Sequence, residues 1–502
     1  MTEPTTVALV SLGCVKNLVD SEKILGQLAE RGAVIAADPA DADIIVINTC
    51  GFLQAARAEG HKVIAEMLRY RRSGRCRRIV VVGCLVQRDG HALLDAFPEI
   101  DALVSVHRRD DVPDAVLAGT TKPAAPPSQP RRRSGAKAGH RRQADLYLGA
   151  YHPHVALDTA RLRLTPRHYA YLRISEGCNQ KCSFCNIPAI RGPMRSKPPQ
   201  VVLAEARELI SDGAAELNII GQDTTAYGKD LHYRPGLAGL LRQLDKLDGL
   251  RWIRLLYAYP TAFTDDMIDA VAECSKVVKY VDLPLQHIND RILKAMRRRV
   301  TRAQIEALLD KLRRRVPDVA IRTTLIAGFP GETEEEFDEL IHFVRQMRFA
   351  AVGVFAYSQE PDTPAGRFEA QLPEKVKQQR VEVIMKTQQE IAFAHAAGLK
   401  GHVLEVLVDE KAARGRYIAR HAGQAPDVDA VTYVLSDKVH PGRFVQVRCE
   451  ASEGYDLIAR PVDDILPNRK TGRTSRREAG RSRPTLESLL DPVGNTTKNH
   501  ED

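Results

Sequence analysis

The chain has 502 residues, 44% of them hydrophobic and 5% aromatic, which predicts about three domains with largely aliphatic cores. No apolar run is long enough to span a bilayer, and the first residues, MTEPTT, lack the basic and apolar regions of a secretion signal. Membrane and exported classes are therefore disfavoured, and a cytoplasmic protein is expected. In a reducing compartment, nine cysteines favour metal ligands or free thiols over disulfides.

The net charge of +9 is unevenly distributed along the chain. Residues 122–142 hold seven Lys or Arg and no acidic residue, and residues 468–483 hold seven Lys or Arg and one Glu. The remainder of the chain is therefore slightly acidic. Such basic segments are either solvated, disordered charge or arms that contact RNA or a ribosome, and the sequence does not choose between the two.

Residues 5–118 alternate strand-like and helix-like stretches. Strands are expected at 7–14, 42–50, 78–84 and 101–106, with the last of these closing the series, and helices at 20–32 and 52–69. The continuous apolar run ADIIVINTC is typical of a parallel strand that is covered on both faces. This alternation predicts an N-terminal domain built on an open parallel α/β sheet.

Three cysteines of this domain stand at the ends of expected strands, namely Cys14, Cys50 and Cys84. In open α/β sheets, ligands bind beyond the carboxyl ends of the strands. One interpretation is that these are small buried thiols, as free cysteines often are. Their equivalent places at three strand ends favour the other interpretation, a single metal site that all three share.

Residues 119–145 are rich in Pro, Ser, Ala and Arg and predict a disordered basic linker. The following region, 164–395, alternates helices with six more expected strands, at 171–175, 216–221, 252–258, 280–286, 321–328 and 351–358. Two of the helices begin with capping boxes, Thr301 with Gln304 and Thr333 with Glu336. Six βα units form most of a parallel barrel, whose sites lie on the loops after the strands.

From 397 to 467 the pattern changes to short strand-like runs, at 401–410, 416–421, 429–436 and 442–451. They predict a small all-β barrel or sandwich, followed over 468–502 by a disordered basic tail. The expected fold class is α/β throughout the first two domains: an open parallel sheet, then a partial (βα)6 barrel, and finally the small all-β domain.

The loop after the first barrel strand reads EGCNQKCSFCNIP, residues 176–188. It holds Cys178, Cys182 and Cys185 in the spacing C-x3-C-x2-C. A structural zinc site or a simple ferredoxin-type cluster uses four protein ligands. Either a fourth ligand comes from elsewhere, or one iron of a four-iron four-sulfur (4Fe-4S) cluster is left open to bind a substrate.

This motif, with the aromatic Phe184 before its last cysteine and its place in a six-unit barrel, resembles the radical S-adenosylmethionine superfamily. The resemblance implies that the methionyl amino and carboxyl groups of S-adenosylmethionine bind the open iron. It also implies that the reduced cluster splits this cosubstrate to a 5′-deoxyadenosyl radical. Strong reduction is required, and cluster potentials extend to about −700 mV.

Residues 5–467, apart from the linker, resemble the methylthiotransferases, which combine a three-cysteine N-terminal domain, a radical core and a β domain of the TRAM type. The resemblance implies a transferase with two 4Fe-4S clusters and S-adenosylmethionine. The auxiliary cluster, on Cys14, Cys50 and Cys84, would carry the transferred sulfur on its open iron, and the radical cluster would lie on Cys178, Cys182 and Cys185.

Four short stretches resemble the RimO type within this family: SLGCVKNLVDSE, GQDTTAYGKDL, YAYPT and DLPLQH. That type methylthiolates the β-carbon of an aspartate in small-subunit ribosomal protein 12, which implies this protein or the small ribosomal subunit as partner. The sister branch modifies a tRNA adenosine and typically has Gln-Met-Asn where this chain has Val-Lys-Asn. The basic tail keeps the tRNA alternative open, and a non-catalytic iron–sulfur electron carrier is the alternative of another class.

Other positions carry weaker signals. Gln222 and Asp223 follow the second barrel strand and either bind the methionyl amino group or form a simple turn. The stretch AGFPGET, 327–333, resembles a segment that contacts the cosubstrate, or only shapes a turn. His287 either lines the cavity or is structural. Cys76, Cys274 and Cys449 are interpreted as ordinary thiols. Catalytic residues beyond the cluster ligands, the sulfur source, the reductant and the oligomeric state are not specified.

Overall fold

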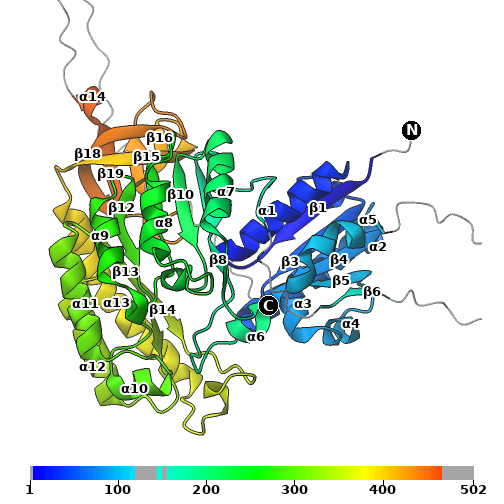
Figure 1. The fold of residues 1–502 in the computed structure, drawn as a ribbon, viewed down its shortest axis with the longest axis horizontal. Coiled ribbons are helices and arrows are strands. Elements are labelled where there is room, and N and C mark those ends of the chain that lie inside the picture. The colour runs from blue at the N-terminus through cyan, green and yellow to red at the C-terminus, as the bar shows by residue number, and fades with distance from the viewer. Residues whose placement is uncertain (1–3, 119–143, 150–154, 156, 466–502) are drawn as a thin grey trace, which may run out of the picture. The chain divides into compact units, whose positions relative to one another are not determined.

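The computed structural model describes residues 4–118, 144–149, 155 and 157–465 (Figure 1). The basic tail and nearly all of the basic linker lie outside these residues, so their disorder stays a prediction, as do the exact domain limits. None of the described helices has both the length and the apolar character needed to cross a membrane.

The N-terminal domain is built on a six-stranded parallel sheet with the order β2-β1-β3-β4-β5-β6. Its strands are β1 Thr6–Ser11, β2 Val34–Ile35, β3 Ile44–Thr49, β4 Arg78–Gly83, β5 Ala102–Ser105 and β6 Asp145–Tyr147. Its helices are α1 Val15–Glu30, α2 Gln54–Ser73, α3 Cys84–Asp89, α4 Ala92–Ala96 and α5 Val112–Leu117. Every residue of β3 is buried, since hydrophobic clusters cover both faces of the sheet. The predicted open parallel sheet is confirmed.

Two strands of this sheet were not expected. β6 pairs in parallel with β5, with Leu146 opposite Leu103, so the prediction that the strand at 101–106 closes the sheet is wrong. The predicted linker consequently runs one residue too far, because Asp145 is already in β6. Both missed strands have only two or three residues and lie at the sheet edges, where no apolar periodicity marks them.

The central region forms a second six-stranded parallel sheet with the order β14-β13-β12-β11-β10-β7, which confirms the predicted six βα units. Its strands are β7 Tyr169–Arg173, β10 Glu216–Ile220, β11 Trp252–Leu255, β12 Val277–Asp282, β13 Ala320–Ala327 and β14 Ala351–Ala356. Its main helices are α7 Pro199–Ser211, α8 Gly236–Leu244, α9 Asp265–Glu273, α10 Asp290–Ala295, α11 Arg302–Arg315, α12 Glu334–Met347 and α13 Glu374–Gly398. Both predicted capping boxes are present, at the starts of α11 and α12.

A short two-stranded pairing flanks the cysteine loop that follows β7. β8, Ser175–Glu176, pairs antiparallel with β9, Arg195–Ser196, and the chain between them carries all three cysteines and the helix α6, Ile187–Arg191. In Figure 1 the N-terminal helix α1 lies beside this region, and α1 contacts β7. The loop is therefore held at its base and faces the N-terminal domain.

The C-terminal domain is a closed β-barrel with the order β15-β16-β17-β19-β18. Its strands are β15 Val403–Ala413, β16 Arg416–His421, β17 Thr432–Leu435, β18 Phe444–Glu453 and β19 Asp456–Pro461. Four of these strands were predicted. The fifth, β19, closes the barrel, so the structure is the small barrel and not the sandwich that was predicted as its alternative. β19 escaped prediction because polar residues, Asp456 and Arg460, interrupt its apolar run.

Candidate functional site

The loop with Cys178, Cys182 and Cys185 depends on one glycine at its entry. Gly177 has a φ of +78°, and a Cβ there would lie 2.2 Å from the carbonyl oxygen of Pro193. Within the loop, the backbone N–H of Gln180 donates to the Cys178 sulfur at 3.4 Å, and that of Ile187 donates to the Cys185 sulfur at 3.5 Å. Hydrogen bonds to the sulfurs are a known means of tuning cluster ligands.

Side chains between the cysteines anchor the loop to the barrel. The Ser183 hydroxyl donates to the carbonyl of Ala295 at 2.7 Å. The aromatic ring of Phe184 packs against a buried cluster formed by Ile292, Met296, Ile326, Phe329, Tyr357 and Ala365. The motif's aromatic residue therefore has a packing function that fixes the loop over α10 and β13.

Burial raises the pKa of the Cys178 thiol to about 11 and that of Cys185 to about 12. Without a bound cation these thiols stay protonated at neutral pH, and metal binding has to displace their protons. Across the described residues, no three His, Cys, Asp or Glu side chains lie close enough to hold a single metal ion. Three sulfurs on one loop, two of them accepting backbone hydrogen bonds, form a donor set that fits an iron–sulfur cluster.

Neighbouring strands bring the other three cysteines to one edge of the N-terminal sheet. Cys50 directly follows β3, Cys84 directly follows β4, and Cys14 is the N-cap residue of α1 shortly after β1. The loops are in contact: a Cβ on Gly13 would lie 2.7 Å from the Cβ of Cys50. A Cβ on Gly51 would lie 2.7 Å from the carbonyl oxygen of Cys84. The sheet thus assembles three thiols that are far apart in sequence.

Asn17 connects the three auxiliary cysteine loops. Its side-chain amide donates to the carbonyls of Leu12 and Thr49, at 2.9 and 3.0 Å, which precede Cys14 and Cys50. Its carboxamide oxygen lies 3.8 Å from the sulfur of Cys84. One side chain of α1 therefore fixes the relative positions of all three thiols.

The auxiliary thiols differ in their electrostatic surroundings. Burial raises the pKa of Cys84 to about 12 and also raises that of Cys50. Cys14 is exposed as a residue although its thiol is desolvated, and the charges of Lys16 and Arg191 outweigh that desolvation and lower the Cys14 pKa. Cys14 is therefore the auxiliary thiol that loses its proton most readily.

A cavity of about 410 Å³ has residues next to both cysteine sets on its walls. Val15 and Phe52 neighbour Cys14 and Cys50, while the guanidinium of Arg298 lies 3.8 Å from the sulfur of Cys182. The walls also include Tyr171, Gln222, Leu256, Tyr257, Tyr259, Asp282, Gln286, Arg322, Phe355, Pro426 and Val428. All three domains thus contribute to one chamber.

The two candidate cosubstrate residues occupy different positions. Gln222 lines the cavity, and its buried side-chain oxygen has no hydrogen-bond partner among the described residues. Asp223 is also buried but accepts a hydrogen bond from the Gln180 side chain at 2.9 Å and another from the Thr225 hydroxyl. Gln222 therefore offers a free acceptor for an ammonium group, whereas Asp223 links the second barrel strand to the cysteine loop. Their binding role stays a prediction.

The remaining candidates make structural contacts, and a role in cosubstrate binding stays a prediction for His287 and AGFPGET. His287 is fully buried, accepts from the N–H of Asn289 and lies outside the residues that line the cavity. In AGFPGET, the Glu332 carboxylate accepts from the N–H groups of Gly328 and Phe329, so the stretch forms a turn held by its own glutamate. Cys76, Cys274 and Cys449 are buried singly, apart from both sets.

Two cations at this site were missed from the sequence. The Arg298 guanidinium stacks 4.0 Å from the Tyr259 ring centroid, and the Lys16 ammonium lies 3.1 Å from the Tyr257 ring centroid. In the part of the chain that the structure describes, neither cation pairs with a carboxylate. Both tyrosines belong to YAYPT, and Lys16 belongs to SLGCVKNLVDSE. These stretches resemble the RimO type, and that resemblance is the sequence feature that points to the Lys16 and Tyr257 pair.

Comparison with known proteins matches three family descriptions: the radical SAM superfamily over residues 172–344, the uncharacterized protein family UPF0004 over 6–105, and the TRAM domain over 401–462. Proteins named ribosomal protein uS12 methylthiotransferase RimO resemble nearly the whole chain. The one from Anaeromyxobacter sp. (strain K) is 42% identical over 460 residues, 91% of this chain and 93% of that protein. The one from Geobacter sulfurreducens is 42% identical over 456 residues, 90% of this chain and 97% of that protein.

Among solved structures, the chain is similar to the radical S-adenosylmethionine methyltransferase TsrM from Kitasatospora setae, determined with cobalamin and a [4Fe-4S] cluster bound. The similarity has a TM-score of 0.48 and 18% identity, and covers 72% of this chain and 77% of that one.

Proposed function

The chain belongs to the RimO family of ribosomal protein uS12 methylthiotransferases, and we propose that it transfers a methylthio group to the β-carbon of an aspartate in small-subunit ribosomal protein 12. The observation that carries the proposal is the single cavity that has residues beside both cysteine sets on its walls. A radical formed beside one set and a sulfur held beside the other would then be able to reach the same substrate atom. If the two cysteine sets faced separate cavities, the radical and the sulfur could not reach one substrate atom.

The residues of the barrel fit S-adenosylmethionine and a 4Fe-4S cluster. Cys178, Cys182 and Cys185 would hold the cluster, which when bound supplies the electron that cleaves the cosubstrate to a carbon radical. The free acceptor of Gln222 suits the methionyl ammonium, and the Arg298 guanidinium suits the methionyl carboxylate. These two residues would orient the cosubstrate, and Tyr171, Leu256 and Tyr259 line the chamber beside them.

Cys14, Cys50 and Cys84 fit a second cluster with one position left open for the transferred sulfur. Their thiols come from three neighbouring strand ends and are fixed by Asn17. Lys16, two residues after Cys14, lies over the ring of Tyr257, which lines the cavity, and no described carboxylate pairs with Lys16. The carboxylate of an aspartate lies one bond from the β-carbon that receives the sulfur. Lys16 is therefore suited to pair with the substrate carboxylate.

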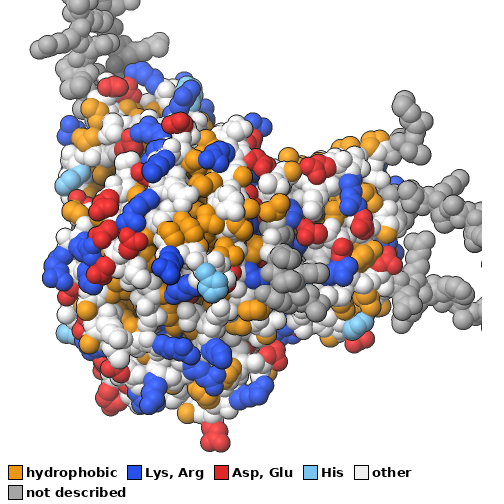
Figure 2. All heavy atoms as spheres, in the orientation of Figure 1, with side chains coloured by type: hydrophobic (Ala, Val, Ile, Leu, Met, Phe, Trp, Pro, Cys, Tyr) orange, Lys and Arg blue, Asp and Glu red, His pale blue; other side chains and the backbone are white. Residues whose placement is uncertain are grey.

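A tRNA adenosine is the second candidate substrate, supported by the TRAM domain match and the basic segments. The described face in Figure 2 shows Lys and Arg intermixed with Asp and Glu. The two basic segments, the candidates for contact with RNA of the small ribosomal subunit or of tRNA, lie outside the described residues. The same chemistry serves either substrate.

The test offers both substrates to one preparation. The clusters are reconstituted anaerobically, S-adenosylmethionine, sulfide and dithionite are added, and small ribosomal subunits, free ribosomal protein 12 and unmodified tRNA are supplied in parallel. Mass spectrometry is expected to find a methylthio group on one aspartate of ribosomal protein 12. Modification of adenosine instead would overturn the proposed substrate, and the absence of 5′-deoxyadenosine would leave only a non-catalytic electron carrier.

A further inference from the structure

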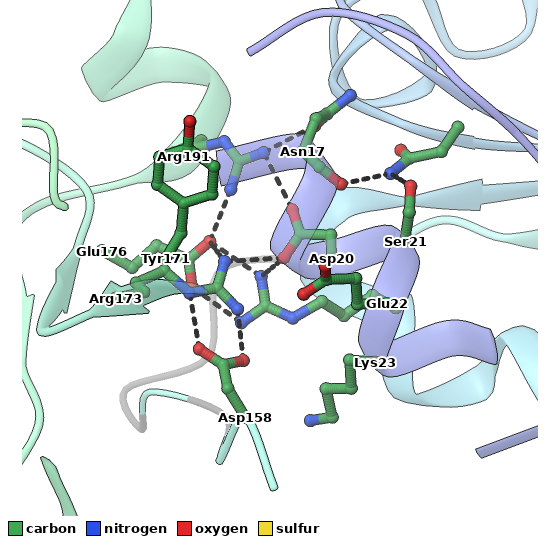
Figure 3. A network of polar contacts seen from close by, with 12 residues as sticks. Asn17, Asp20, Ser21, Glu22, Lys23, Asp158, Tyr171, Arg173, Glu176 and Arg191 are labelled. Atoms are coloured by element: carbon green, nitrogen blue, oxygen red, sulfur yellow. Dashed lines mark hydrogen bonds and ion pairs between the residues drawn. The ribbon is translucent and has the colours of Figure 1, made fainter. Parts of the chain in front are cut away.

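Arg191, on α6, joins the loops of the two cysteine sets (Figure 3). Its guanidinium is 2% exposed and donates to Glu176 at 2.9 Å, to Asp20 at 2.9 Å and to the side-chain oxygen of Asn17 at 2.8 Å. Glu176 ends β8, just before the radical loop, whereas Asn17 and Asp20 lie in α1, just after Cys14. One side chain therefore sets the position of each loop relative to the other.

Arg191 is also the member of this ionic network that reaches the auxiliary sulfurs. The Asn17 oxygen that accepts its hydrogen bond lies 3.8 Å from the Cys84 sulfur, and the preceding residue, Ile190, packs against Cys84. Arg191 therefore approaches the Cys84 thiol through both its hydrogen-bond partner, Asn17, and its chain neighbour, Ile190. The electrostatic neighbour of the radical cysteines is another arginine, Arg298.

A second arginine of the network provides an internal comparison. Arg109 is buried as well and donates to both Glu176 oxygens at 2.8 Å, with Asp20 at 3.1 Å. Its strongest electrostatic partners are Glu176, Asp20 and Arg173, and no cysteine is among them. Arg109 and Arg191 thus share the structural role of joining the domains but differ in their proximity to sulfur.

We propose that Arg191 is a positioning residue that makes the group bound by Cys14, Cys50 and Cys84 easier to reduce, without changing the potential of the group bound by Cys178, Cys182 and Cys185. This inference rests on the proposed function, since it assumes an iron–sulfur cluster at the auxiliary cysteines. Reduction adds a negative charge to such a cluster, and a buried cation at this position stabilises the reduced form. The hydrogen bonds of Arg191 to Glu176, Asp20 and Asn17 hold the guanidinium between the radical loop and α1.

The test measures a midpoint potential rather than turnover. Full-length protein is prepared with Cys178, Cys182 and Cys185 all changed to Ala, so that only the auxiliary cluster assembles, and is titrated under EPR detection. In this background Arg191→Gln is expected to shift the midpoint to a more negative potential. Arg191→Lys, which keeps the charge, and Arg109→Gln, which removes a network cation away from sulfur, are expected to shift it much less.

A second variant covers a failure of Arg191→Gln to fold. Asp20→Asn keeps Arg191 but removes one of the carboxylates that neutralise its guanidinium, so a shift to a more positive potential is expected. Two outcomes would overturn this inference and leave the proposed function standing. One is an equal shift in Arg191→Gln and Arg109→Gln. The other is a shift in the potential of the radical cluster when Arg191→Gln is made in protein with Cys14, Cys50 and Cys84 changed to Ala. A protein with intact radical cysteines that assembles no auxiliary cluster would overturn the two-cluster part of the proposed function, and this inference with it.

Discussion

The two cysteine sets are built in opposite ways. Cys178, Cys182 and Cys185 lie on one short loop, so local sequence places them together once Gly177 and Phe184 have shaped and anchored that loop. Cys14, Cys50 and Cys84 meet only because three parallel strands end side by side. The arrangement of Cys178, Cys182 and Cys185 therefore depends on one correctly shaped loop. The arrangement of Cys14, Cys50 and Cys84 depends on the folded N-terminal domain and on its contacts with the central domain. Changes far from any thiol are expected to impair the second site more than the first.

The largest expected effect separates the chemistry of the two sets. Cys178→Ala is expected to abolish S-adenosylmethionine cleavage, because the loop offers no replacement ligand. Cys50→Ala is expected to retain cleavage and lose sulfur insertion. Chromatography of 5′-deoxyadenosine measures cosubstrate cleavage, and mass spectrometry of the product measures sulfur insertion. If both variants cleaved and inserted normally, the two cysteine sets would not have these separate roles.

The next effect tests the dependence of the auxiliary site on docking. The Glu360 carboxylate, 1% exposed, accepts from Arg88 of α3 at 2.9 Å and from the N–H of Gln54 at 2.8 Å. Glu360→Ala leaves a buried arginine poorly compensated and is expected to cost about 3 kcal/mol of stability. Sulfur insertion is expected to fall while cosubstrate cleavage continues, as followed by thermal unfolding and product assay.

Asp362 is the matched control for this change. It also pairs with Arg88, at 3.1 Å, but its side chain is 58% exposed. Exposed pairs contribute about 0–1 kcal/mol, so Asp362→Ala is expected to leave both activities near their normal levels. An equal loss in the two variants would argue against docking through Glu360.

A smaller effect concerns the packing of the auxiliary loops. Gly13 has a φ of +89°, and Gly13→Ala would also bring its Cβ to 2.7 Å from the Cβ of Cys50. Gly32 has a φ of +83° with nothing within 4 Å, so Gly32→Ala incurs only the backbone cost, about 1–2 kcal/mol. Iron analysis is expected to show loss of the auxiliary share of the iron in the first variant and full loading in the second.

The smallest expected effect concerns the substrate. Lys16→Gln is expected to lower kcat/KM for ribosomal protein 12 about tenfold, the usual scale for one charge-assisted hydrogen bond. Lys23→Gln removes a charge from the same helix, where Lys23 pairs with Asp110 at 2.7 Å, and is expected to have little effect. Cosubstrate cleavage without substrate serves as the reference, and an equal loss in both variants would contradict a substrate contact by Lys16.

The difference between local and long-range contacts also explains which features could be predicted from the sequence. Periodicity was sufficient for the long buried strands, and the loop cysteines were evident from their spacing. The strand-end cysteines could be grouped because parallel strands end on one edge. Arg191, Arg298 and Lys16 could not be placed, since ion pairs and ring contacts between distant segments leave no periodic signal. The short edge strands β2 and β6 escaped for a related reason, because sheet pairing rather than local preference forms them.

The Arg191 contacts also bear on how the protein is made. A ribosome adds residues in order, at about 5–20 per second, so Cys14, Cys50 and Cys84 all exist before the segment that carries Arg191 has been synthesised. During that interval Asn17 and Asp20 lack the guanidinium that joins them to Glu176. The nascent N-terminal domain therefore presents its thiols before their charged partner arrives. The complete hydrogen-bond network around Asn17 and Asp20 can therefore form only after residue 191 has been translated.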